Sequence, residues 1–277
     1  MSIYKGERFY RKVYNADMEK TLKQRIGKVY IASTVGITVG VLLVGKFFIH
    51  KFGLDTITLN ALVGSIIASS TFITGFLLSG VFSDYKEVEK IPAELRSSLE
   101  SILSEGEALG RKDAGFDTNR ARNIVIKFIK EFEEGLGDKK NHSHLEHALE
   151  VISEFDIVFD DMERRGVPPN YMTRIKSEQS QLKKTLLRVY HIQKTNFIPS
   201  VSVLVESIVL LVILLLLFVD ADTYMGMIGL GMISYLLLYT MELIHVLEKP
   251  FRKGKDDTCD DVSIFLLREL SEKLKLK

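Results

Sequence analysis

The sequence predicts an all-α membrane protein with four spans, in which two transmembrane helical hairpins flank a helical cytoplasmic domain. Two observations support this fold class. Four long apolar segments occur at 29–49, 59–82, 197–219 and 224–247, and the stretch between the second and the third is highly charged. About 20 apolar residues in a helix cross the ~30 Å hydrocarbon core of a bilayer, so each segment is close to a full span.

The chain divides into five parts by hydropathy. A mean hydropathy of +0.11 with 26% charged residues reflects apolar spans averaged with polar regions. We predict a basic N-terminal arm (1–28), a first hairpin (29–82), a cytoplasmic helical domain (83–196), a second hairpin (197–247) and a C-terminal acidic segment with an amphipathic helix (248–277).

Lysine and arginine beside the spans predict the orientation. The turn within the first hairpin contains only Lys51, and the turn within the second contains no base, whereas both outer flanks are basic. We therefore expect an integral protein of the plasma or inner membrane whose termini and middle domain are cytoplasmic. The basic arm either binds anionic lipid headgroups or only sets the topology.

The middle domain shows helical signals throughout. Asp84–Leu109 continues the second span with an interruption near Pro92, and Asp117 or Thr118 caps a helix that ends at Gly135 or Gly137. Ser143 and Glu146 form a capping-box pattern that predicts one helix as far as Arg165.

Two further helices complete the predicted soluble part. Tyr171–Lys194 is long and charged, and it leads to the third span. Asp260–Lys277 is amphipathic, with an apolar face predicted at Val262, Phe265, Leu266 and Leu270.

The second span places Phe72 and Phe76 one helical turn apart among small residues, and Ser83-Asp84-Tyr85-Lys86-Glu87, Ile91 and Pro92 follow. Lys249-Pro250-Phe251 comes after the fourth span and precedes four aspartates, Asp256, Asp257, Asp260 and Asp261. These two stretches, with the order of spans, resemble the bestrophins. The chain departs from typical members in having no tryptophan.

The resemblance implies an oligomeric channel, most often a pentamer, that passes chloride or other small anions. It places a hydrophobic neck at Phe72 and Phe76, with Ala68 at the third neck position. Aromatic ring edges carry partial positive charge and can favour a passing anion, and apolar rings form a constriction that dewets. The alternative is that both rings fill the interior of the helix bundle.

The acidic residues after the fourth span have two interpretations. Animal bestrophins bind calcium at this place, so the resemblance makes Asp256, Asp257, Asp260 and Asp261 candidate calcium ligands, and carboxylate oxygens suit that ion. Capping of the last helix by Asp260 or Asp261 is the alternative.

Glu206 is a carboxylate deep in the third span. Such groups are costly in a membrane and usually face a partner or a wet cavity. It is a candidate gate or cation site. Alternatively it is a neutral side chain hydrogen-bonded to Ser200, Ser202 or Ser207.

His144 and His147 are three residues apart on a predicted helix, where they face the same way. With Glu146 or Glu150 they form a candidate metal site. A polar helix start explains the same residues without a metal.

The sequence contains no phosphate-binding glycine loop, nucleophile elbow or His-Glu-x-x-His, so no enzyme is expected. A net charge of +1 gives no attraction to nucleic acid. The first hypothesis is a homo-oligomeric anion channel whose partners are lipid, further copies of the chain and small inorganic ions. The alternatives are a non-conducting scaffold or sensor and a cation pathway controlled by Glu206.

Overall fold

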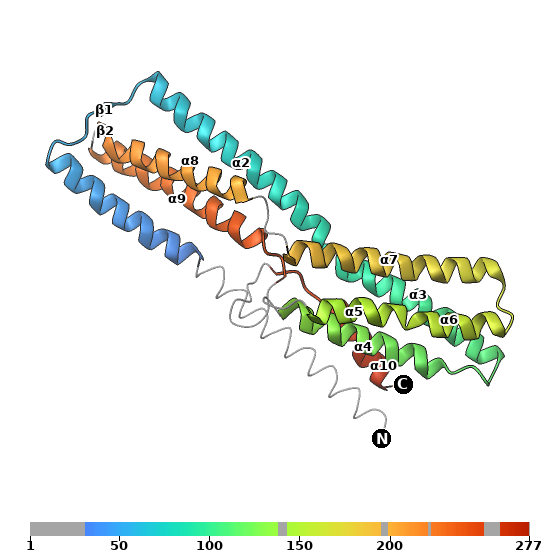
Figure 1. Ribbon diagram of the computed structural model, residues 1–277. Coiled ribbons are helices and arrows are strands. Elements are labelled where there is room, and N and C mark those ends of the chain that lie inside the picture. Colours follow the sequence, from blue (N-terminus) through green and yellow to red (C-terminus); the bar gives the residue numbers. More distant parts are fainter. Residues whose placement is uncertain (1–30, 138–142, 195–198, 221–222, 252–260, 277) are drawn as a thin grey trace. The chain divides into compact units, whose positions relative to one another are not determined.

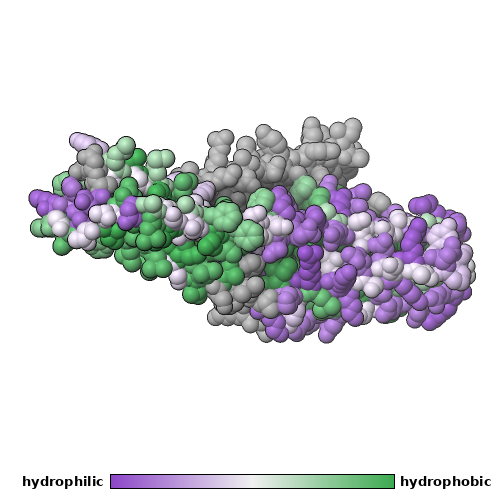
Figure 2. Space-filling view, turned by 90° about the horizontal axis from the view of Figure 1, so that it is seen from above, coloured by the Kyte–Doolittle hydropathy of each residue, from purple (hydrophilic) through white to green (hydrophobic). Residues whose placement is uncertain are grey.

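The computed structural model describes residues 31–137, 143–194, 199–220, 223–251 and 261–276 (Figure 1). Nearly all of these residues are helical, so the predicted fold class is confirmed. The chain forms two compact units. Of the described residues, the membrane unit comprises 31–85, 199–220, 223–250 and 261, and the polar unit comprises 86–137, 143–194, 251 and 262–276. Figure 2 shows hydrophobic residues gathered on the membrane unit and hydrophilic ones on the polar unit.

Within the described residues, four helices are long and apolar enough to cross a membrane. They are the helix Ile31–Lys51, α2 (Ala61–Glu89), α8 (Pro199–Phe218) and α9 (Thr223–Leu247). The Asn60 side chain caps α2 by accepting a hydrogen bond from the amide of Val63 at 3.0 Å. Gly53, with φ +63°, ends the first helix, and the amides of Gly53 and Leu54 bond back to His50 and Ile49. The four predicted spans are present.

The core of the membrane unit lies between α8 and α9 and includes one residue of α2. The buried side chains recur every three or four residues along α8 and every seven along α9, which is the spacing of packed helices. They include Val205, Val209, Val212 and Leu216 of α8, Leu230, Leu237 and Ile244 of α9, and Val81 of α2.

A short parallel pairing joins the turns of the two hairpins. β1 (Ile57–Thr58) pairs with β2 (Val219–Asp220), with Ile57 opposite Val219. Beside it, the buried Lys46 ammonium donates to the carbonyls of Leu217, at 3.0 Å, and Val219. Lys46 thus satisfies carbonyls at the end of α8 that have no helical partner. The sequence showed no strand pattern here.

The polar unit is built from α3 (Ile91–Lys112), α4 (Thr118–Gly137), α5 (Ser143–Ser153), α6 (Phe155–Arg164), α7 (Pro169–Lys194) and α10 (Phe265–Leu276). The predicted interruption falls at Lys90, and Pro92 lies in the first turn of α3, where its missing amide costs nothing. Asp117 caps α4 as predicted, because its carboxylate accepts from the amides of Asn119 and Arg120.

The prediction of one helix from Ser143 to Arg165 is wrong, because the helix breaks at Glu154. The amide of Glu154 bonds to Val151 three residues back, and that of Ile157 bonds to Glu154. These tighter turns redirect the chain, so that Phe155 and Phe159 of α6 are completely buried. Gly166, with φ +77°, ends α6 before the two prolines.

The core of the polar unit is aromatic and aliphatic. Its largest fully buried side chains include Phe128 and Phe132 of α4, Phe155 and Phe159 of α6, and Leu95, Leu99 and Ile102 of α3. The last helix, α10, packs with Leu267, Leu270 and Leu274 buried, whereas Phe265 is 45% exposed. Its predicted apolar face was therefore only partly right: Val262 and Leu270 are buried, and Phe265 is not.

Candidate functional site

The two faces of α2 differ sharply in composition. One stripe is buried in the membrane unit and includes Val63, Thr74 and Val81. Phe72 and Phe76 lie on the opposite, exposed face, 74% and 70% exposed, and residues four apart share a helix face. The bundle-interior interpretation of these rings is therefore excluded within one chain.

The rest of this exposed face is made of small residues. Ala61, Ser65, Ala68, Ser69, Gly75 and Ser79 are all exposed there. A Cβ added at Gly64, Gly75 or Gly80 would meet nothing within 4 Å in the chain. Small residues in membrane helices allow close approach of another helix.

Hydroxyls of Ser65, Thr71 and Thr74 in α2 bond to the backbone of their own helix. Ser65 donates to the carbonyl of Ala61 at 2.7 Å, and Thr71 donates to that of Ile67 at 2.9 Å. Such bonds satisfy the hydroxyl donors in an environment with little water. The face is thus mildly polar without carrying a charge near Phe72 and Phe76.

The structure places His245 beside Glu206. The His245 Nε2 atom of α9 lies 3.2 Å from the Glu206 Oε1 atom of α8, and the Glu206 side chain is 54% exposed. The predicted serine partners are elsewhere: Ser202 donates to Glu248 at 2.8 Å, and Ser207 donates to the carbonyl of Val203. The side chain of Ser200 lies outside the described residues.

His245 was missed as a partner because it lies at the end of a different span. Only the antiparallel packing of α8 on α9 brings it level with Glu206. The imidazole of His245 is thus a partner for the Glu206 carboxylate on the facing helix.

His144 and His147 lie together on α5 as predicted, and the group of potential ligands around them contains Glu131 of α4 rather than Glu146 or Glu150. Glu131 of α4 supplies a carboxylate within reach of both histidines. Glu146 instead accepts a hydrogen bond at 3.0 Å from the hydroxyl of Tyr190 on α7. Glu131 was missed because it belongs to another helix, and no local spacing marks it.

The acidic segment is only partly described. Asp256, Asp257 and Asp260 lie outside the described residues, and Asp261 is half-buried. The last helix begins at Phe265, four residues after Asp261, and the amide of Phe265 bonds to the Ser263 hydroxyl at 3.4 Å. Ser263 therefore bonds to an amide at the start of α10, and capping by Asp260 or Asp261 stays a prediction.

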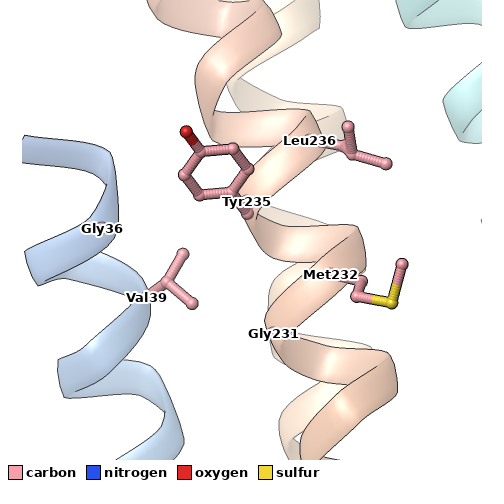
Figure 3. A pocket seen from close by; sticks show the side chains of 6 residues that line it. All are labelled: Gly36, Val39, Gly231, Met232, Tyr235 and Leu236. Carbon is pink, nitrogen blue, oxygen red and sulfur yellow. The ribbon is translucent and has the colours of Figure 1, made fainter. Parts of the chain in front are cut away.

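A groove of about 370 Å³ lies between the helix Ile31–Lys51 and α9 (Figure 3). Val39 and the ring of Tyr235 face each other across it, and Gly36 and Gly231 leave it room. Among the described residues that line this groove there is no carboxylate, amine or imidazole. Its surface suits contact with an apolar group rather than a catalytic or ion-binding site.

The arrangement of helices is similar to that in solved structures of a bacterial Bestrophin homolog from Klebsiella pneumoniae. Two of these, each with one substitution, have TM-scores of 0.67 and 0.68 at 13% identity. The match covers 89% of this chain and 97% and 98% of theirs. A structure described as a membrane protein has a TM-score of 0.69 at 14% identity, over 89% of this chain and 97% of its own.

No protein-family model matches the sequence, and no curated protein matches it. The similarity therefore rests on the arrangement of the helices, and it extends over almost the full length of both chains. The fold expected from the Phe72–Phe76 and Pro250–Phe251 stretches is thereby confirmed: this chain is an integral membrane protein with the bestrophin fold.

Proposed function

We propose that the chain is a subunit of an oligomeric ion channel that passes chloride or other small anions, with Phe72, Phe76 and Ala68 at its neck. The observation that carries this proposal is the exposed face of α2. In a single chain, no other helix covers the two large rings and the row of small and hydroxyl residues on this face. Copies arranged around an axis would cover the small residues and bring the rings together.

Each part of that face has a role in such an assembly. The small residues allow α2 helices of neighbouring copies to approach closely. The rings narrow the path, and their edges favour an anion without a buried base. The resemblance to bestrophins suggests five copies. The fold likeness and the sequence motifs support the same family.

The test of conduction is a planar-bilayer recording of the purified protein in asymmetric KCl. An anion channel reverses near the chloride equilibrium potential. Reversal near the potassium potential would overturn the anion proposal and favour a cation pathway at the exposed Glu206 carboxylate. An absence of current, or a monomer by mass measurement, would favour the scaffold alternative.

The test of the neck is the double variant Phe72→Ala with Phe76→Ala. Both rings are exposed within the chain, so their removal should leave the fold and the assembly intact. Widening the neck should raise the single-channel conductance or abolish closing. Phe82→Ala is the matched control, because Phe82 is also an exposed ring of α2 but lies off the line of the other two. Unchanged conductance in the double variant would place the rings against lipid.

A further inference from the structure

Glu131, His144 and His147 form a compact group of potential metal ligands in the polar unit. One ligand atom of each lies within 4.8 Å of the others. The His144 Nδ1 atom lies 2.8 Å from the Glu131 Oε2 atom and 3.4 Å from an oxygen of Glu134. The four residues come from α4 and α5 only.

We propose that Glu131, His144 and His147 bind a zinc ion, with Glu134 placed to complete or support the shell. Two imidazoles and a carboxylate are ligands that zinc accepts in a tetrahedral site. With metal–ligand distances of about 2.0–2.2 Å, the ligand atoms around one tetrahedral ion lie about 3.3–3.5 Å apart. The group needs only small side-chain rotations to reach that spacing.

The donor atoms also favour zinc over calcium. Calcium takes six to eight oxygen ligands, whereas this group offers two nitrogens. Imidazole suits zinc and its neighbours in the first transition row. The site is therefore chemically distinct from the acidic residues that follow Phe251.

The backbone beneath the group is fixed by close packing. Gly135 of α4 lies against Leu145 of α5, and a Cβ at Gly135 would approach the Leu145 side chain to 2.7 Å. Phe132, Leu145 and Ala148 are completely buried on the inner side of the same two helices. Rigid helices hold ligands in place better than loops do, so a metal would find the group largely assembled.

A metal-free hydrogen bond between His144 and Glu131 explains part of this geometry, but it does not involve His147. His147 is exposed, and its ring stands edge-on to that of His144 with the centroids 6.3 Å apart. A zinc site needs the His147 imidazole, whereas the hydrogen bond does not. His147 is therefore the residue that separates the two explanations.

The test uses the purified full chain with any affinity tag removed and zinc chloride as the probe. We expect zinc to raise the melting midpoint and to bind with a measurable heat. His147→Gln and Glu131→Gln should each weaken binding by at least about tenfold, the loss that even an outer-shell partner can cause. His191→Gln and Glu89→Gln, which change exposed residues of the same unit, should bind zinc like the wild type.

Cobalt gives a second measurement that needs no variant. Cobalt in a tetrahedral nitrogen and oxygen site has intense visible absorption, and zinc should remove that absorption by displacement. If zinc leaves the melting midpoint unchanged, if His147→Gln binds zinc as well as the wild type, or if cobalt shows only the pale octahedral spectrum, the proposal is wrong. The cobalt result stands even where a variant folds poorly.

Discussion

Arg165 ties two segments of the polar unit together through one guanidinium. It donates to the Asp113 carboxylate, to the carbonyl of Gly115 at 2.7 Å and to Asp161 at 3.1 Å. Its charge also lies 5.9 Å from the centre of the Phe116 ring. The connection between α3 and α4 is thereby fastened to the end of α6.

This contact predicts a pH dependence of stability. The hydrogen bond from Arg165 holds the pKa of Asp113 below its ordinary value of 3.8. A lowered carboxyl pKa stabilises the fold above pH 3.8, and this contribution disappears as the pH falls through the lower, folded value. Arg165→Met should therefore lower the melting midpoint near neutral pH, and the gap to the wild type should narrow below pH 3.8.

The neighbouring Arg164 supplies the control for this prediction. Arg164→Met removes an equal charge from the same turn, and the side chain is exposed. Its melting midpoint should follow that of the wild type at every pH. A gap between Arg165→Met and the wild type that stayed constant down to acid pH would show that Asp113 does not carry the effect.

At the scale of the elements, two glycines with different surroundings test how closely the helices of the polar unit pack. Gly106 of α3 has room for a methyl group, because a Cβ there would meet Met162 at 3.5 Å. Gly135 of α4 has none, because of Leu145. Both are in helices, where alanine is favoured over glycine by about 1 kcal/mol.

We expect the two alanine substitutions to have opposite signs. Gly106→Ala should raise the melting midpoint, since the gain in helix propensity comes without a clash. Gly135→Ala should lower it, because α4 and α5 must separate to accommodate the new methyl group. If both variants were more stable than the wild type, the result would contradict the close contact between α4 and α5 at Gly135.

The helix α2 illustrates how one element meets two requirements. Its stripe through Val63, Thr74 and Val81 packs in the membrane unit, and its opposite stripe carries Phe72 and Phe76. The two sides of the helix are similarly hydropathic, so the sequence does not show which side is buried. Burial distinguishes the two sides, because most of the small residues of α2 are exposed together with Phe72 and Phe76.

For the whole molecule, the orientation in the membrane remains a prediction from the basic flanks. The test uses two single-cysteine variants, Thr56→Cys and Ser180→Cys, in a chain whose Cys259 is replaced by serine. Thr56 is in the first hairpin turn and Ser180 is on α7, and both residues are exposed. A membrane-impermeant thiol reagent added to intact cells should label the first and spare the second. Labelling of Ser180→Cys but not of Thr56→Cys would show that the topology is the reverse of the predicted one.

The sequence by itself determined the four spans, the helical class and several helix ends. Long apolar runs dominate local energetics in a membrane, since backbone groups there must bond within their own helix. Pro92 and the Asp117 cap act within one turn of the chain, so their effects are visible in a short window. The likeness to the bestrophin fold followed from two such local stretches.

Only the tertiary structure decided which side chains meet across helices. Glu131 lies beside His144, His245 beside Glu206, and Lys46 at the end of α8, each because separate segments pack together. The break at Glu154 likewise has no helix-breaking residue to mark it in the sequence. It allows Phe155 and Phe159 to be buried in the core. Local pattern sets the direction in which a side chain points along its own helix, but packing decides what it faces.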